Sequence, residues 1–245
     1  MGSRTERIST GSFDTNKWLY GGYESGVITM LAGSPGSGKT NFCILVACSQ
    51  AKKGNKVIFI DTEGGFSPDR VRQIVGDNYE DILKNILLLE PKSFKEQEKV
   101  FKNLLESVKK ENISLIVIDG MAMLYRLELG DAVNDGESNA IKGVNREVAN
   151  QMRDLAEISR TQGIPIIITN QVYKEFLSEK DLKKGKRAGT NIVGGDLFKY
   201  WSKCIIELAV EGNRRRAILV KHRSLPRKEM LFDIRDAGIF RKGWI

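Results

Sequence analysis

Residues 33–40 have the full spacing of a phosphate-binding loop, Gly33-Ser34-Pro35-Gly36-Ser37-Gly38-Lys39-Thr40. Glycines in such a loop let backbone N–H groups surround phosphate oxygens, and the helix that follows adds positive potential. Lys39 can reach the β- and γ-phosphates, and the Thr40 hydroxyl can bind Mg²⁺. An apolar run precedes the motif, and a helical pattern continues to Ala51. This context predicts a site for ATP and Mg²⁺ and disfavours an ordinary glycine-rich turn.

Two carboxylates that follow apolar runs could complete such a site. Asp119 follows Leu115–Ile118, and a carboxylate beside a phosphate-binding loop holds the Mg²⁺ shell. The alternative is an aspartate that caps the next turn. Glu63 follows Val57–Ile60, at the sheet edge where α/β proteins bind ligands, and could accept a proton from the water that attacks the γ-phosphate. The alternative for Glu63 is a solvated loop acid.

Two segments resemble RecA-type recombinases of the archaeal and eukaryotic kind. They are Phe59-Ile60-Asp61-Thr62-Glu63-Gly64 with Phe66, Pro68, Asp69 and Arg70, and Ile167-Ile168-Thr169-Asn170-Gln171-Val172. The resemblance implies that Glu63 is the catalytic base and that Arg70 packs on the adenine. It also implies that Gln171 senses the γ-phosphate and passes the nucleotide state to a DNA-binding loop that follows. Without the resemblance, Arg70 reads as a helix-surface cation and Gln171 as a strand cap.

The resemblance covers nearly the whole chain, from Ile8 to the strand that begins at Met230, and is strongest to short paralogues of the family. Nothing before residue 8 has the length of the helical DNA-binding domain of full recombinases, so we expect that domain to be missing. The resemblance implies an ATP-binding and DNA-binding paralogue that assists homologous recombination and DNA repair, with weak DNA-dependent ATPase activity. A full-length recombinase or a second copy is the implied protein partner. Two alternatives stay open: a KaiC-like signalling ATPase without DNA binding, and a nucleotide-switched adaptor without turnover.

The whole chain has 39 Lys and Arg, 31 Asp and Glu, and a formal net charge of +8. The positive charge is concentrated in the last third of the chain. Basic side chains contact backbone phosphates without sequence preference, and Tyr173 and Phe176 could stack on bases. The candidate DNA-binding residues are Lys174, Lys180, Lys183, Lys184, Lys186, Arg187, Arg214, Arg215 and Arg216. A merely solvated surface is the alternative. The position of the first six after Gln171 favours DNA, single-stranded and read without sequence preference.

Lys221 and Arg223 are predicted to end a strand, where RecA-like ATPases often carry a basic pair that reaches the γ-phosphate of a neighbouring subunit. Residues i and i+2 of a strand point the same way, so both cations could approach one anion. The alternative is a basic edge that faces nucleic acid or solvent. His222, the only histidine, is predicted to face the opposite way and has no partner for a metal site.

A parallel sheet must position these residues. Near-continuous apolar runs, typical of strands buried on both faces, are Val27–Ala32, Val57–Ile60, Ile86–Leu89, Leu115–Ile118 and Ile164–Thr169. Helical patterns lie between them. One begins at the capping box of Ser93 and Glu96, and another runs from Ile141 to Gly163. Three later runs predict antiparallel strands, at Ile205–Val210, Ala217–Val220 and Met230–Ile234.

The predicted fold class is therefore α/β, a RecA-like P-loop NTPase core whose mainly parallel sheet is flanked by helices and extended by antiparallel C-terminal strands. We expect one domain over residues 1–245, with residues 1–7 flexible and the polar connections 126–138 and 174–195 serving as ligand loops. The three cysteines, Cys43, Cys48 and Cys204, have no metal-site spacing, and no apolar run approaches the ~20 residues that cross a bilayer. A cytoplasmic protein without membrane contact is expected.

Overall fold

A mainly parallel sheet positions the phosphate-binding loop. The computed structural model describes residues 6–136, 138–174 and 190–243. Within them the strand order is β12-β11-β10-β9-β3-β7-β6-β4-β5, and β8 pairs with β7. The run from β9 to β5 is parallel, whereas β8 and the C-terminal strands are antiparallel, which confirms the predicted fold class. The strands are β3 (Ile28–Gly33), β4 (Lys56–Asp61), β5 (Ile86–Leu89), β6 (Ile113–Asp119), β7 (Ile166–Lys174), β8 (Thr190–Ile192), β9 (Cys204–Glu211), β10 (Arg214–Lys221), β11 (Lys228–Arg235) and β12 (Gly238–Arg241).

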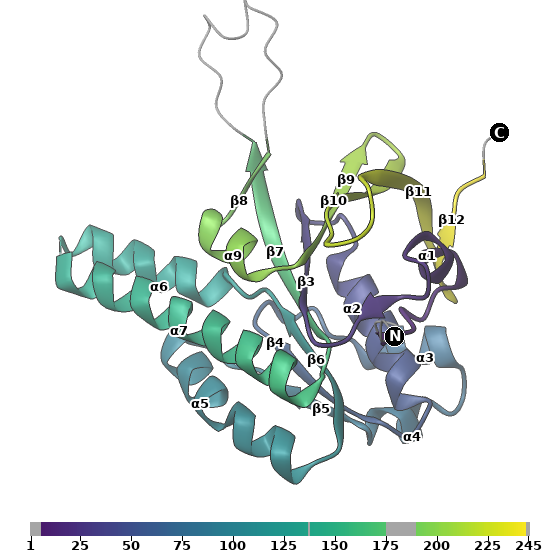
Figure 1. The fold of residues 1–245 in the computed structure, drawn as a ribbon, viewed down its shortest axis with the longest axis horizontal. Helices are drawn as coiled ribbons and strands as arrows, with labels where there is room; N and C mark the ends of the chain where they lie inside the picture. Colours follow the sequence, from purple (N-terminus) through teal and green to yellow (C-terminus); the bar gives the residue numbers. More distant parts are fainter. Residues whose placement is uncertain (1–5, 137, 175–189, 244–245) are drawn as a thin grey trace, which may run out of the picture.

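Helices cover both faces of this sheet (Figure 1). One face packs on α2 (Lys39–Ala51), α3 (Pro68–Val75) and α4 (Tyr79–Leu83), and the other on α5 (Phe94–Lys110), α6 (Met123–Asn134), α7 (Ser138–Gln162) and α9 (Asp196–Trp201). Neighbouring strand residues alternate between the two apolar cores, so that Leu31 enters one and Met30 the other. Burial on both faces explains why these strands are continuous apolar runs in the sequence. None of the described helices has the length and apolar character to cross a membrane.

Local signals determine the ends of two helices as predicted. The Ser93 hydroxyl accepts the backbone N–H of Glu96 at 3.2 Å, and the Glu96 carboxylate accepts the N–H of Lys92 at 2.7 Å. These bonds satisfy donors that an uncapped helix start would leave free. The helix α7 ends at Gln162, directly before Gly163, whose φ is 67°. A glycine in this left-handed conformation ends a helix without a steric penalty.

The polar connection 126–138 is not a loop, so that prediction is wrong. The helix α6 continues through it to Asn134, and α7 begins at Ser138. The two helices lie side by side and project beyond the sheet (Figure 1). Tyr125 and Ala132 are buried, and the Tyr125 hydroxyl donates to the Asn145 side chain of α7 at 2.7 Å. Packing against α7 therefore outweighs the polar composition of this segment.

The connection 174–195 is partly a strand pair. The strand β7 passes its predicted end at Thr169 and continues to Lys174, and β8 returns beside it. Residues 175–189 lie outside the described part of the chain.

Arg7, the last residue of the segment that was predicted to be flexible, lies in a short strand pair. Arg7 belongs to β1 (Arg7–Ile8), which pairs with β2 (Tyr23–Glu24) on either side of α1 (Phe13–Trp18). Its guanidinium donates to the Leu19 carbonyl at 3.0 Å and pairs with the buried Glu24 carboxylate at 3.0 Å. These long-range bonds order the segment, and residues 1–5 are outside the described residues.

Candidate functional site

Four strand ends bring the predicted nucleotide-site residues together. The phosphate-binding loop follows β3, Glu63 follows β4, Asp119 ends β6 and Gln171 lies in β7. In the sheet register Asp61 is opposite Asp119, and Gly33 is opposite Gln171. Because these strands are parallel, their carboxyl ends lie at one edge of the sheet, where α/β folds bind ligands.

The phosphate-binding loop contains buried polar groups suited to phosphate. Lys39 is 6% exposed, and its ammonium donates to the Gly33 carbonyl at 3.0 Å and the Ser34 carbonyl at 3.1 Å. One of the three ammonium donors remains for a phosphate oxygen. The Ser37 hydroxyl is buried without a hydrogen-bond partner. Burial lowers the pKa of Lys39, and the negative charge of Glu63 opposes that shift.

Thr40 and Asp119 both lie close to Gly65 and offer oxygen atoms of the kind that bind Mg²⁺. A Cβ on Gly65 would lie 3.3 Å from Thr40 Oγ1 and 3.8 Å from Asp119 Oδ2, so a side chain at this position would crowd the Thr40 hydroxyl. Asp119 Oδ1 accepts the Thr169 hydroxyl at 2.7 Å, whereas Oδ2 is buried without a hydrogen-bond partner. A hydroxyl and a carboxylate are the hard oxygen ligands that Mg²⁺ combines with substrate phosphates. The residues therefore fit the predicted ion.

Asp119→Asn is expected to stabilise the nucleotide-free protein while removing Mg²⁺-dependent nucleotide binding. Burial raises the pKa of Asp119 above its ordinary value. The hydroxyls of Thr40 and Thr169 oppose this shift, whereas the negative charges of Asp61 and Glu63 add to it. Because the folded-state pKa exceeds the unfolded one, the ionised carboxylate lowers stability above the raised pKa. The loss of stability disappears as the pH falls through the raised pKa towards about 4, the ordinary pKa of an aspartate.

Thermal melting across that pH range tests the expectation. Above neutral pH the variant should have a higher melting temperature than the unsubstituted protein, by roughly 2–4 °C for each kcal/mol of added unfolding free energy. This difference in melting temperature should disappear at acidic pH. The exposed Asp77→Asn is the matched control. Parallel melting curves for Asp119→Asn and Asp77→Asn would contradict the assignment.

Asp61 holds the loop that carries Glu63. Its carboxylate is 1% exposed and accepts the backbone N–H groups of Glu63 at 3.1 Å, Gly64 at 2.9 Å and Phe66 at 2.8 Å. Gly120 approaches the same loop with a φ of 93°, and a Cβ there would lie 2.7 Å from Glu63 Cγ. Asp61 is a positioning residue that the sequence analysis did not single out. An aspartate directly before a polar loop often accepts hydrogen bonds from the backbone of that loop, so its position could have indicated this role.

Gln171 connects Glu63 to the β7–β8 strand pair. Its side-chain Nε2 donates to Glu63 Oε1 at 3.2 Å. Its backbone carbonyl accepts the Val193 N–H at 3.0 Å, and the side chain of Asn170 donates to the Val193 carbonyl at 2.8 Å. The strand pair, which projects from the sheet in Figure 1, is thus bonded at its base to the nucleotide site.

Arg126 is a candidate that the sequence reasoning missed. It lies in the first turn of α6 and lines a small pocket together with Glu63, Gly120 and Gln171. Its side chain is exposed. Residues 126–138 were predicted to form a loop, whereas the helix α6, which begins at Met123 shortly after β6, places this cation beside the site.

Arg70 lies near the nucleotide site but already has several partners. Its guanidinium donates to Asn41 Oδ1 at 2.8 Å, to the Arg235 carbonyl at 2.8 Å and to the Asp236 carbonyl at 3.0 Å. It therefore holds the turn between β11 and β12 against α2. Packing of Arg70 on adenine stays a prediction.

Lys221 and Arg223 do not lie side by side on a strand, so that geometric expectation is wrong. The strand β10 ends at Lys221, after an irregularity in its pairing with β9. The Lys221 ammonium donates to the Lys199 carbonyl at 2.7 Å, and Arg223 Nε donates to the buried Glu24 carboxylate at 2.7 Å. Different partners therefore direct the two side chains. Their role towards a neighbouring subunit stays a prediction.

The predicted DNA-binding residues divide into two groups. Lys180, Lys183, Lys184, Lys186, Arg187 and Phe176 lie outside the described residues, and Lys174 ends β7. Tyr173, which precedes Lys174 in β7, is 53% exposed. Arg214 is exposed at the β9–β10 turn, whereas Arg216 pairs with Glu211 and Glu229. Arg215 is half-buried in β10, so Arg214 is the best placed of the three for a phosphate.

Comparison with known proteins places these features in a family. The model of the Rad51 family matches residues 2–242. The DNA repair and recombination protein RadB of Methanosphaera stadtmanae is 39% identical over 228 residues, 91% of each chain. That of Methanocaldococcus jannaschii is 39% identical over 221 residues, 90% of this chain and 96% of the relative. That of Methanococcoides burtonii is 40% identical over 222 residues, 90% of this chain and 91% of the relative. The chain, with its parallel sheet, phosphate-binding loop and paired Glu63 and Gln171, therefore belongs to the Rad51 family.

Proposed function

We propose that this chain is a recombinase paralogue that binds ATP with Mg²⁺, binds single-stranded DNA, and assists homologous recombination and DNA repair. The observation that supports it best is the 3.2 Å hydrogen bond between Gln171 and Glu63. This bond joins the nucleotide site to the strand pair that leads into the lysine-rich segment. The RadB relatives carry repair and recombination in their names, which fits this role.

In this proposal each part of the site has one task. Backbone N–H groups of residues 33–40, with Ser37 and Lys39, hold the phosphates, while Thr40 and Asp119 hold Mg²⁺. The ion offsets phosphate charge. Glu63 accepts a proton from the attacking water, and Asp61 keeps its loop in place. We expect this hydrolysis to be weak and DNA-dependent.

Gln171 couples nucleotide state to DNA. When its amide turns from Glu63 to the γ-phosphate, the backbone bond from Val193 to Gln171 transmits the change to β7 and β8. Tyr173 and the basic residues of the segment 174–190 would then meet the DNA strand. A full-length recombinase or a second copy would contact the chain elsewhere, with Lys221 and Arg223 as candidates.

A gel-shift assay on single-stranded DNA, with and without ATP, tests the proposal. ATP-dependent retardation of unrelated sequences is expected. Gln171→Ala should keep ATP binding and lose the ATP dependence of the shift. Absence of DNA binding in every condition would favour the KaiC-like alternative. ATP and recombinase binding without turnover would favour the adaptor.

Neutralising Lys183, Lys184, Lys186 and Arg187 together should weaken binding to unrelated DNA sequences alike. Each lost phosphate contact lowers the log–log salt slope by roughly 0.7 on single strands. ATP affinity should hardly change. If binding and salt slope survive this change but collapse when Arg214, Arg215 and Arg216 are neutralised, the DNA surface lies at the β9–β10 turn instead.

A further inference from the structure

A basic pocket lies at the end of the sheet away from the phosphate-binding loop. Its volume is about 420 Å³, and it is bordered by Gly26–Ile28 at the start of β3, by Arg160 in the last turn of α7 and by Tyr200 and Trp201 at the end of α9. From Ile28 to Gly33, β3 extends over roughly 16 Å. The pocket is therefore separate from the nucleotide site described above.

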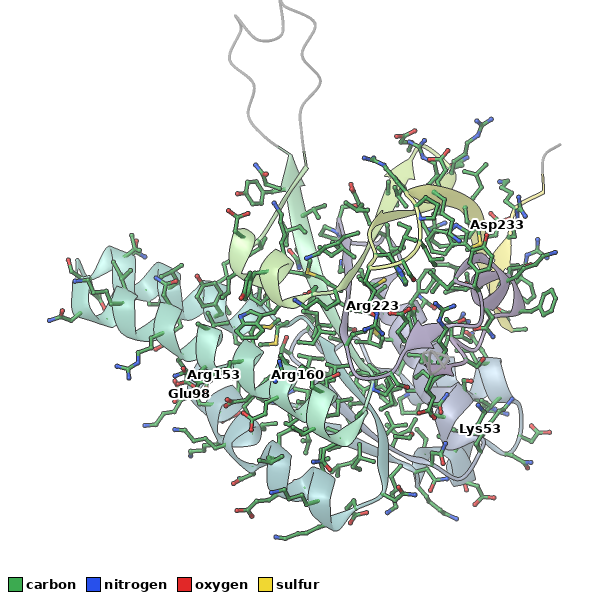
Figure 2. The ribbon with its side chains drawn as sticks, viewed as in Figure 1. Lys53, Glu98, Arg153, Arg160, Arg223 and Asp233 are labelled. Carbon is green, nitrogen blue, oxygen red and sulfur yellow. The ribbon has the colours of Figure 1, made fainter. Side chains whose placement is uncertain are left out.

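Among the described residues, three cations and no acid line this pocket. They are Arg160, Lys203 and Arg223, and Figure 2 labels Arg160 on α7 and Arg223 after β10. Behind Arg223 the buried Glu24 accepts bonds from both Arg223 at 2.7 Å and Arg7 at 3.0 Å, so its one negative charge balances only one of them. The bond to Glu24 also fixes the guanidinium of Arg223, whose side chain is 46% exposed. The excess positive charge favours an anionic ligand.

An exposed aromatic ring stands beside the cations. Tyr200 is 68% exposed, and the Trp201 ring meets it edge-on with centroids 5.2 Å apart. The Lys203 ammonium lies 5.5 Å from the Tyr200 centroid. Aromatic rings next to Lys and Arg are the combination that binds a nucleobase by stacking and its phosphate by charge.

We propose that this pocket binds one nucleotide unit, with its base on Tyr200 and its phosphate among Arg160, Lys203 and Arg223. A pocket of 420 Å³ has the size of small-molecule sites in proteins. The unit comes either from a free mononucleotide or from single-stranded DNA. Only the second source rests on the DNA-binding function proposed above.

Tryptophan fluorescence of the full chain tests the pocket, with thymidine monophosphate and a short oligothymidylate as the two probes. Both titrations are repeated in the Lys39→Ala background to remove the phosphate-binding loop as a competitor. We expect quenching that disappears in Trp201→Phe. Tyr200→Ala should weaken binding about 5–150-fold, as expected for a lost base stack. Arg160→Glu should lower the salt slope for the oligonucleotide by at least roughly 0.7.

The control is Lys53→Glu, a charge reversal at an exposed lysine after α2 that is also labelled in Figure 2. It should leave both titrations unchanged. Melting curves check that each variant is folded. Quenching by both probes assigns the pocket to DNA, and quenching by the monophosphate alone assigns it to free nucleotides.

Two results separate this inference from the proposed function. If Tyr200→Ala and Arg160→Glu change the binding of neither probe, the inference is overturned. The cations would then only complement the carboxyl ends of α7 and α9. DNA binding would then depend on the segment 174–190, and the proposed function would stand. If the chain binds no DNA but the monophosphate still quenches Trp201, the proposed function fails and the pocket remains.

Discussion

Replacing Glu63 with glutamine should lower the rate of ATP hydrolysis by about 10²–10⁴-fold while ATP remains bound. Glutamine keeps a carbonyl oxygen that can accept the 3.2 Å hydrogen bond from Gln171, and the loop stays held by Asp61. The substitution therefore removes the proton acceptor and little of the structure. Steady-state phosphate release in the presence of single-stranded DNA measures the rate, and calorimetry measures ATP affinity.

Glu106→Gln on α5 is the matched control. This glutamate is 73% exposed and, among the described residues, forms an ion pair with Lys110 across one helical turn. Such surface pairs contribute little to stability. The control should hydrolyse ATP at the unsubstituted rate. An unaltered rate in Glu63→Gln would assign this residue to structure and leave the adaptor alternative in place.

Replacing Lys39 with alanine should weaken ATP binding roughly 10–150-fold, the effect of losing one charged hydrogen bond of about 1.5–3 kcal/mol. The Lys39 ammonium also bonds the carbonyls of Gly33 and Ser34, so its loss changes the loop as well as the ligand contact. Calorimetric titration with ATP and Mg²⁺ measures the affinity. Melting of the nucleotide-free protein measures the effect on the loop.

Lys39→Met separates these two contributions, because methionine keeps an apolar stem in the buried site and lacks the charge. It should lose as much ATP affinity as Lys39→Ala and melt closer to the unsubstituted protein. Lys53→Ala, at an exposed lysine, should change neither quantity. Full ATP affinity in Lys39→Met would place the phosphates away from this loop.

The residues of the candidate nucleotide site could be located in the sequence because they belong to short local motifs at strand ends. Gly33–Thr40, Glu63 and Asp119 each follow an apolar run, and parallel strands bring their carboxyl ends to one edge. The order of the strands β3-β7-β6-β4 in the sheet then decides which of these motifs become neighbours. The resemblance added Gln171, and the structure places that residue 3.2 Å from Glu63.

Contacts between distant segments decided the rest. Composition suggested a loop at residues 126–138, yet most of this segment belongs to the helix α6, which packs against α7 and brings Arg126 to the candidate site. Arg223 bonds Glu24, which is 199 positions away, and this pairing turns it from the expected strand direction.

The sequence by itself thus determined the class of fold, the phosphate-binding loop and the strands that carry the candidate site. Only the tertiary structure decided the conformation of α6, the direction of Arg223 and the basic pocket between β3, α7 and α9. The physical reason is the sequence distance over which each kind of interaction acts. Periodicity and motifs report a residue's neighbours in sequence, whereas burial and ion pairing depend on neighbours in space, which form only when the whole sheet is assembled.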